Sequence, residues 1–334
     1  MFRTIAILAG SALAACAPRI APPGPELGPP AIQAGESAEV ARYKTLDGYE
    51  TTLRQWLPQG PPEAVILALH GFNDHSSFIA PGAEVWRERG IATFAYDQRG
   101  FGEGPNRGLW AGAEVMAEDS RALLRLLRER YPETPLFLLG ESMGGAVAIA
   151  AVTDRSAPKV DGLILAAPAV RSRATLNWGF RASLYLISHS LPWLALKPSG
   201  APVQASDNIE ALRALGADPL VVKRTRMDSV HGLVDLMDLA QERVVLLNEP
   251  LLLLVGEKDE LIPAEAMELF WARLPEDAKG QRRANYPEGW HLLFKDLQAE
   301  TVIQDVATWV KAPDQRLPSG ADRRPVAEPR DGAG

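Results

Sequence analysis

The sequence predicts an α/β fold with a mostly parallel central sheet flanked by helices. The first observation behind this prediction is a series of short apolar runs, which suit strands buried on both faces. These runs cover residues 64–69, 91–96, 136–139, 163–165 and 251–255. The second is that helical segments lie between the runs, and such alternation favours a parallel sheet. The third is composition, because 46% apolar residues in a chain of 334 can supply a sizeable core.

Two further segments have clear local signals. Residues 40–45 and 50–56 flank Asp47-Gly48, a dipeptide typical of β-hairpin turns. Residues 114–130 repeat apolar side chains at helical spacing, with acidic residues at the start and basic residues at the end. This charge order complements the helix dipole. We therefore expect an antiparallel hairpin before the parallel strands and a long helix among them.

The alternation of strands and helices stops between the sixth and seventh predicted strands. About residues 169–241 are predicted to form helices at 178–191, 208–215 and 230–242, with no strand-like run between them. Neighbouring strands of such a sheet seldom need so long a connection. We predict that this segment is a helical cap over the strand ends. The alternative is a group of large helices that flank the sheet.

The predicted folded domain, residues 38–311, lies between segments whose composition cannot build a core. Residues 17–37 are rich in Pro and Gly, which is typical of an extended tether. Residues 312–334 are rich in Pro, Gly, Asp and Arg and lack apolar periodicity. We predict that this tail is disordered.

The first residues resemble the signal peptide of a bacterial lipoprotein. Arg3 precedes a short apolar stretch at residues 5–12, and Leu13-Ala14-Ala15-Cys16 resembles a lipobox. The resemblance implies a signal peptide over residues 1–16 and lipidation of Cys16. It places the domain in the bacterial cell envelope, at the outer membrane facing the periplasm. The alternative is ordinary signal cleavage at Ala12-Leu13-Ala14, which would give a periplasmic or secreted protein.

Charge and the scarcity of ligand residues exclude several classes of function. The net charge is −7 and there is no dense Lys/Arg run, so we expect no nucleic-acid partner. Cys16 is the single cysteine, which leaves no intramolecular disulfide and no cysteine-based metal site. The five histidines have no metal-ligand spacing. We therefore predict no catalytic metal and no other cofactor, and make no prediction of oligomeric state.

The motif with the most chemical content is Gly140-Glu141-Ser142-Met143-Gly144. Gly-x-Ser-x-Gly places a serine nucleophile on a sharp turn from a strand to a helix, where the glycines leave room for the turn. The apolar run 136–139 precedes the motif, and residues 146–151 form a helix-compatible apolar run after it. We predict that Ser142 is the nucleophile of an α/β-hydrolase fold and forms an acyl-enzyme.

A serine hydroxyl needs a base to remove its proton, and in this fold the acid and then the base follow the nucleophile along the chain. His291 follows the last strand-like segment and is the predicted base. Asp259 comes shortly after the strand at 251–255 and is the predicted acid that orients the imidazole. Glu257 and Glu260 are the alternatives for that acid.

Two backbone N–H groups are predicted to stabilise the oxyanion that develops in the reaction. One belongs to Met143, directly after the nucleophile. The other belongs to Phe72 in His70-Gly71-Phe72, because this segment follows the strand at 64–69 and Gly71 permits close approach. We expect His70 to support the loop. His75 stays open as a loop contact or a substrate contact.

Together these motifs resemble the monoacylglycerol lipase and lysophospholipase group of α/β-hydrolases, also described as serine aminopeptidase S33-like hydrolases. The resemblance covers about residues 40–310. It rests on His70 to Ser76, Asp97 to Gly102, Gly140 to Gly145, Asp218 to Val221, Gly256 to Asp259, and His291. It implies a carboxylic ester hydrolase that acts on a small lipid-like ester such as a monoacylglycerol or lysophospholipid.

The cap segment around Trp178 cannot be matched to that group residue by residue. Its apolar and aromatic side chains suit an acyl chain and equally suit packing of the cap on the core. We take Trp178, His75 and Trp290 as candidate substrate contacts.

Other functions remain open on the same three residues. They are an acyltransferase, a thioesterase, and an aminopeptidase in which Asp235 and Asp238 would hold a substrate ammonium group. The alternative from a different class is a non-catalytic envelope binding protein, although all three members of the triad are present.

Overall fold

The computed structural model describes residues 17–197 and 203–323. The predicted signal peptide with Cys16 lies outside the described residues, as do residues 198–202 and the end of the predicted tail, 324–334.

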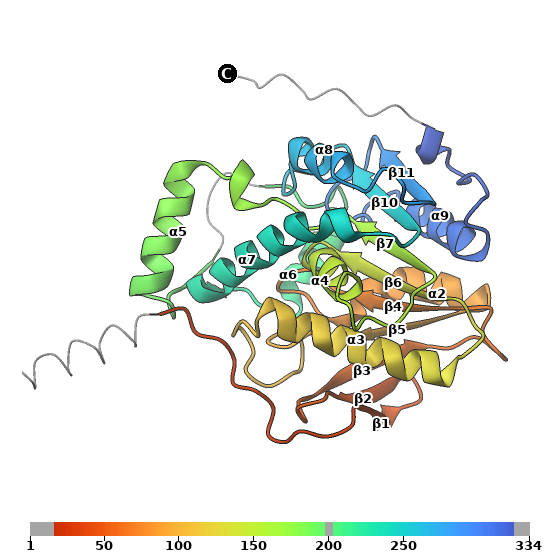
Figure 1. Ribbon diagram of the computed structural model, residues 1–334, viewed down its shortest axis with the longest axis horizontal. Coiled ribbons are helices and arrows are strands. Elements are labelled where there is room, and N and C mark those ends of the chain that lie inside the picture. The colour runs from red at the N-terminus through yellow and green to blue at the C-terminus, as the bar shows by residue number, and fades with distance from the viewer. Residues whose placement is uncertain (1–16, 198–202, 324–334) are drawn as a thin grey trace, which may run out of the picture.

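Within the described residues, a nine-stranded sheet has the order β1-β2-β3-β5-β4-β6-β7-β10-β11 (Figure 1). Its antiparallel part contains β1 (Ala31–Ser37), β2 (Val40–Lys44) and β3 (Glu50–Trp56), and β3 pairs antiparallel with β5. The remaining strands pair in parallel. They are β4 (Ala64–Leu69), β5 (Ile91–Tyr96), β6 (Leu136–Glu141), β7 (Gly162–Ala166), β10 (Leu251–Gly256) and β11 (Gln281–Tyr286). The predicted fold class, a mostly parallel sheet flanked by helices, is confirmed.

Helices cover both faces of the sheet because its central strands are apolar on both sides. Along β4, Val65, Leu67 and Leu69 face one core, and Ile66 and Ala68 face the other. The first core is covered by α3 (Ala113–Arg130), α4 (Met143–Val152) and α8 (Ala264–Ala272). The second is covered by α2 (Ala80–Glu88) and α9 (Ala299–Lys311). None of the described helices is long and apolar enough to cross a bilayer.

The segment between β7 and β10 contains the predicted cap helices, which are α5 (Trp178–Ser190), α6 (Ile209–Ala217) and α7 (Met227–Arg243) (Figure 1). This segment also contains two short strands that were not predicted. They are β8 (Ala195–Leu196) and β9 (Thr225–Arg226), which pair antiparallel with each other. Helix α7 connects the cap to the domain, since Val234, Leu236 and Ala240 are buried in the first core.

The prediction of a tether over residues 17–37 is wrong for residues 31–37. For the residues before them it leaves out contacts with the domain. Residues 31–37 form β1, paired with β2. Before it, the Ala21 N–H donates to the Trp110 carbonyl (2.7 Å) and the Gly28 N–H to the Leu46 carbonyl (2.8 Å). Pro and Gly rule out a helix here, but an extended chain keeps N–H groups that can pair with the domain. The described part of this segment therefore lies along the domain.

The predicted disordered tail is also wrong for residues 312–323. Leu317 and Ala321 are buried in the second core. The Ser319 N–H donates to Asp305 of α9 (3.1 Å), and Asp322 lies 3.7 Å from Arg282 of β11. Two buried apolar side chains and these polar contacts hold the segment on the domain, although its composition alone suggested no ordered contact.

A buried ion network ties the predicted hairpin turn to the sheet-flanking helix. Arg99, in the loop after β5, donates to Asp119 of α3 (Nε–Oδ2 2.5 Å) and to Asp47 in the turn (Nη2–Oδ1 2.5 Å). Its guanidinium also lies 4.6 Å from the centre of the Tyr49 ring. Asp47 in turn accepts the Gly24 N–H (2.6 Å). One arginine thus connects three segments that are far apart in the sequence.

We predict that Arg99→Gln lowers the free energy of unfolding by about 3–5 kcal/mol, because it leaves the Asp119 carboxylate buried without its cation. Urea denaturation measures the change. The matched control is Arg87→Gln, which removes an exposed pairing with Glu84 and should cost less than about 1 kcal/mol. Equal losses for the two variants would contradict the role given to the Arg99 network.

Candidate active site

Ser142 occupies the sharp turn between β6 and α4. Its backbone has φ 52° and ψ −116°, a conformation that L-residues seldom adopt and that clusters at functional sites. The turn needs glycine on both sides. A Cβ on Gly144 would lie 2.1 Å from the Leu69 carbonyl oxygen, and one on Gly140 would lie 2.3 Å from the Gly144 carbonyl oxygen.

The three predicted triad residues come together at the carboxyl ends of the strands. His291 Nε2 lies 2.9 Å from Ser142 Oγ, and His291 Nδ1 lies 2.8 Å from Asp259 Oδ2. Because a carboxylate only accepts hydrogen bonds, Nδ1 carries the proton and Nε2 is left to accept the serine hydroxyl. This is the tautomer that a general base requires.

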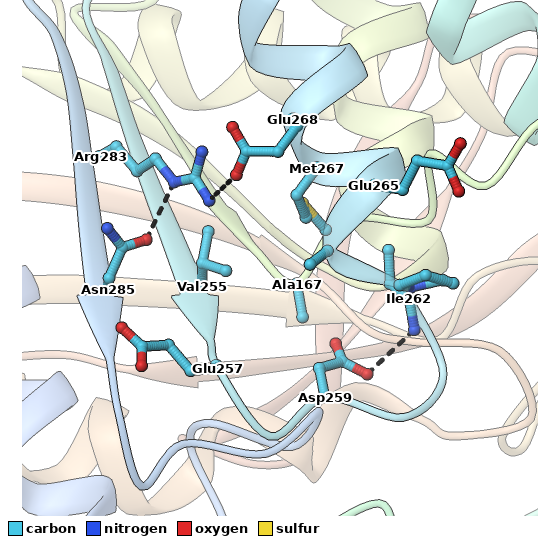
Figure 2. Close-up of a pocket in the computed structure, with 13 residues that line it drawn as sticks. Ala167, Val255, Glu257, Asp259, Ile262, Glu265, Met267, Glu268, Arg283 and Asn285 are labelled. Atoms are coloured by element: carbon cyan, nitrogen blue, oxygen red, sulfur yellow. Dashed lines mark hydrogen bonds and ion pairs between the residues drawn. The ribbon is translucent and has the colours of Figure 1, made fainter. Parts of the chain in front are cut away.

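Asp259 is held in place by backbone donors. Its Oδ1 accepts the N–H of Leu261 (2.8 Å) and of Ile262 (3.0 Å), the latter visible in Figure 2. This leaves Oδ2 for His291. The carboxylate therefore keeps a fixed direction toward the imidazole.

The charges around His291 favour its protonated form. Burial alone would lower the pKa of this histidine, which is 3% exposed. The carboxylates of Asp259, Glu141 and Asp296 outweigh burial and hold the pKa of His291 above its usual value. The imidazolium that forms when serine loses its proton is thereby stabilised.

The two alternative acids do not contact His291. Glu257 lines a separate cavity of about 410 Å³ with Asp259, Met267 and Arg283. Figure 2 shows Arg283 in this cavity directed toward Glu268 and Asn285. Glu260 accepts the Gln204 N–H (2.7 Å) and lines the cavity of Ser142.

The predicted oxyanion donors belong to two segments that lie close to the nucleophile. Met143 begins α4, and Phe72 lines the same cavity as Ser142. The loop of Phe72 comes close to the serine, since a Cβ on Gly71 would lie 3.4 Å from Ser142 Cβ. In the part of the chain that the structure describes, neither N–H donates to a backbone carbonyl. Both donors are therefore available to a ligand.

Ser142 and His291 line a cavity of about 600 Å³ beneath the cap. Its polar side chains besides these two are Asn73, Asp74, Glu141, Arg171 and Glu260. Most of the other lining is apolar: Phe72, Leu176, Phe180, Val203, Leu215, Val221, Val222, Val230, Leu233, Val234, Met237, Leu261, Ile262 and Leu292. The lining thus combines a few polar side chains with a larger number of apolar ones.

None of the three candidate substrate contacts lines this cavity. Trp178 is 80% exposed on α5. His75 is a loop contact, because its Nε2 lies 2.9 Å from Asp218 Oδ2 at the end of α6. The ring of Trp290 lies beneath the Lys258 ammonium, with 5.9 Å between Lys258 Nζ and the ring centre. His70 supports its loop, as expected, through a bond from the Gln98 N–H to its Nε2 (2.9 Å).

The apolar residues that α7 contributes to the cavity could have been found from their spacing in the sequence. Val230, Leu233, Val234 and Met237 follow the i, i+3, i+4, i+7 pattern of one helix face, and all four line the cavity from α7. Trp178 of α5 was chosen because that segment is rich in aromatic residues, but the composition of a helix does not show which of its side chains face a cavity.

Comparison with known proteins agrees with this geometry. A family model described as serine aminopeptidase, S33 matches residues 60–298. Monoglyceride lipase of Rattus norvegicus is 29% identical over 275 residues, covering 79% of this chain and 88% of the relative. Monoacylglycerol lipase of Mycolicibacterium smegmatis is 26% identical over 257 residues, covering 76% and 90%.

Solved structures share the fold. The monoacylglycerol lipase of Paleococcus ferrophilus superimposes with a TM-score of 0.66 at 23% identity, over 79% of this chain and 99% of that one. A soluble variant of monoglyceride lipase from Saccharomyces cerevisiae, in complex with a substrate analogue, gives 0.67 at 18% identity, over 88% and 100%.

The fold and these relatives define the class: the protein is a serine ester hydrolase with the α/β-hydrolase fold. Within that class, the chain belongs to the serine aminopeptidase S33 family and is similar to its monoglyceride lipases.

We predict that Asp259→Asn lowers kcat by about 10⁴-fold, because the imidazole loses the partner that fixes its tautomer. The variant also removes a negative charge that raises the pKa of His291. The acid limb of the kcat/KM profile, and the His291 resonance in an NMR titration, should therefore move to lower pH. Glu257→Gln is the control and should leave kcat, the acid limb and the His291 resonance unchanged. An acid limb that stays in place in Asp259→Asn would contradict this electrostatic role.

Proposed function

We propose that the protein hydrolyses a monoacyl lipid ester, monoacylglycerol- or lysophospholipid-like, through an acyl-enzyme on Ser142. The observation that carries the proposal is the 2.9 Å contact of Ser142 Oγ with His291 Nε2 in a cavity of about 600 Å³ with apolar cap walls. A cavity of this size suits a drug-sized or single-chain ligand.

In the proposed reaction, Ser142 Oγ attacks the ester carbonyl carbon while His291 Nε2 takes the hydroxyl proton. The N–H groups of Phe72 and Met143 stabilise the oxyanion. When the bond from the carbonyl carbon to the alcohol oxygen breaks, His291 gives its proton to the leaving alcohol. Water then attacks the acyl-enzyme, His291 takes a proton from it, and the carboxylic acid leaves as Ser142 regains its hydrogen.

The names of the relatives support a monoacylglycerol substrate, because the Rattus norvegicus and Mycolicibacterium smegmatis proteins are monoglyceride or monoacylglycerol lipases. Phospholipase YtpA of Bacillus subtilis, 25% identical over 250 residues, supports the lysophospholipid-like alternative. Both substrates have one acyl chain and a polar alcohol, which suits a cavity lined by many apolar and a few polar side chains.

The aminopeptidase alternative loses the feature that suggested it. Asp235 and Asp238 are both engaged by Arg173, with Asp235 Oδ1 2.6 Å from Arg173 Nη2, and neither lines the cavity. They are therefore not free to hold an ammonium group. An acyltransferase or thioesterase would use the same acyl-enzyme with another acceptor or leaving group, and no separate observation favours either.

We expect Ser142→Ala to abolish turnover of monoacylglycerols and p-nitrophenyl esters while the protein stays folded. A fluorophosphonate probe should label the wild type and leave Ser142→Ala unlabelled. A series of monoacylglycerols of increasing chain length, tested with a form lacking residues 1–16, measures the range of acyl groups. Wild-type turnover by Ser142→Ala, or peptide cleavage without ester cleavage by the wild type, would overturn the proposal.

We also propose that the domain is held at a membrane through acyl chains on Cys16, in the envelope compartment that the lipobox-like Leu13-Ala14-Ala15-Cys16 implies. Ile20 pairs with Trp110, and four residues of extended chain reach at most about 14 Å. Trp110 contacts α7, since a Cβ on Gly232 would lie 2.3 Å from its ring. The described chain that follows the anchor residue therefore meets the domain beside α7.

Expression of the full chain in a bacterial host with radiolabelled palmitate tests the anchor. The wild type should be labelled and fractionate with membranes, whereas Cys16→Ser should carry no label. Ser11→Ala, within the apolar stretch, is the control and should keep the label. An unlabelled wild type in the soluble periplasmic fraction would instead indicate ordinary signal cleavage.

A further inference from the structure

Glu141 is a buried acid whose charge acts on His291 but to which the proposed mechanism assigns no contact with the substrate. It is the last residue of β6, directly before Ser142, and it is 1% exposed. It lines the same cavity as Ser142 and His291. Its position therefore puts a carboxyl group beside the reacting atoms.

The Glu141 carboxyl has no hydrogen-bond partner among the described residues, and its Oε2 is fully buried. Leaving a buried polar group in this state costs free energy. The nearby cation is already engaged, because Lys295 Nζ lies 2.6 Å from Asp74 Oδ2. A ligand in the cavity can supply the partner that the protein does not.

The surrounding charges select the chemistry of that ligand. Lys295 acts on Glu141 through space, and Asp74, His291 and Asp296 do so as well. Asp74, Asp296 and the cavity-lining Glu260 outnumber Lys295 and the cavity-lining Arg171. An anionic group beside Glu141 would therefore be repelled. A neutral hydroxyl meets no such repulsion and can hydrogen-bond to a carboxyl group in either protonation state.

The protonation state of Glu141 suits such a ligand. Burial raises the pKa of Glu141 to about 7, with Lys295 opposing the rise and Asp74 adding to it. Near neutral pH the carboxyl is therefore present in both forms, as a donor and as an acceptor.

We propose that Glu141 is a specificity-determining residue that binds a free hydroxyl group of the alcohol half of the substrate, next to Ser142. This inference rests on the proposed ester hydrolysis and refines it. It assigns the apolar cap wall to the acyl chain and the carboxyl beside the nucleophile to a neutral polyol. It favours a glycerol monoester over an ester whose alcohol carries an anionic group.

The test compares two esters of one acid that differ only in hydroxyl groups, monooctanoylglycerol and propyl octanoate. Glu141→Leu should lower kcat/KM for monooctanoylglycerol roughly tenfold or more beyond any loss for propyl octanoate. A loss common to both esters reports the charge that Glu141 contributes at His291. Glu141→Gln keeps an amide that can bind a hydroxyl and should fall between wild type and Glu141→Leu on the glycerol ester.

Two controls separate specificity from folding. Glu141→Leu removes a buried carboxyl that lacks a partner, so its midpoint of urea denaturation should equal or exceed that of the wild type. Glu257→Gln changes an acid just after the neighbouring strand β10, in the separate cavity, and should leave the ratio of the two esters unchanged.

The outcomes are distinguishable. If both esters lose activity in parallel, Glu141 acts through Ser142 or His291 and the inference is wrong. If neither changes, or if the wild type does not prefer the glycerol ester, the inference is also wrong while ester hydrolysis stands. If the wild type cleaves neither ester, the proposed function and the inference both fail.

Discussion

The strained turn at Ser142 is the constraint on which the rest of the site depends. Its N–H donates to the Ala166 carbonyl (2.9 Å) and its own carbonyl accepts the Ala169 N–H (2.8 Å), so the end of β7 and the segment after it both hold the turn. The close approach of Gly144 to the Leu69 carbonyl fixes it against β4. A turn that relaxed toward ordinary dihedral angles would carry Oγ away from His291 Nε2. The packing of three parallel strands therefore sets the geometry of one hydroxyl group.

The sequence predicts the parts of the fold that obey simple burial rules. Strands β4, β5 and β10 are apolar on both faces and coincide with the predicted runs. The edge strands were harder to predict, because β11 begins with Gln281, Arg282 and Arg283 and has no apolar run. Strand β1 lies in a Pro/Gly-rich part of the chain and pairs with a neighbour along one edge only, and most of its residues are exposed. Partnering with a neighbour, rather than local composition, makes these segments strands.

The same distinction applies to the site. Chain order and the carboxyl ends of parallel strands were enough to select Ser142, Asp259 and His291, because this edge is where loops of such sheets converge. Cap residues have no comparable rule. Trp178 and Phe180 are two residues apart on α5, yet Phe180 lines the cavity and Trp178 faces solvent. Which face of a cap helix turns inward depends on its packing against α7, and that is a tertiary property.

The charge distribution beside Ser142 also bears on the release of the acid product. A neutral ester can enter the cavity without electrostatic opposition, and its acyl chain gains from the apolar wall of α7. Hydrolysis of the acyl-enzyme converts that half of the substrate into a carboxylate. The new anion forms in a cavity lined by Glu141, Asp74 and Glu260 as well as Arg171, and those carboxyl groups that are ionised repel it. The alcohol leaves uncharged, so the repulsion acts on the acid product alone. The acids that line the cavity would therefore help to expel the fatty acid, the product that the apolar wall would otherwise retain.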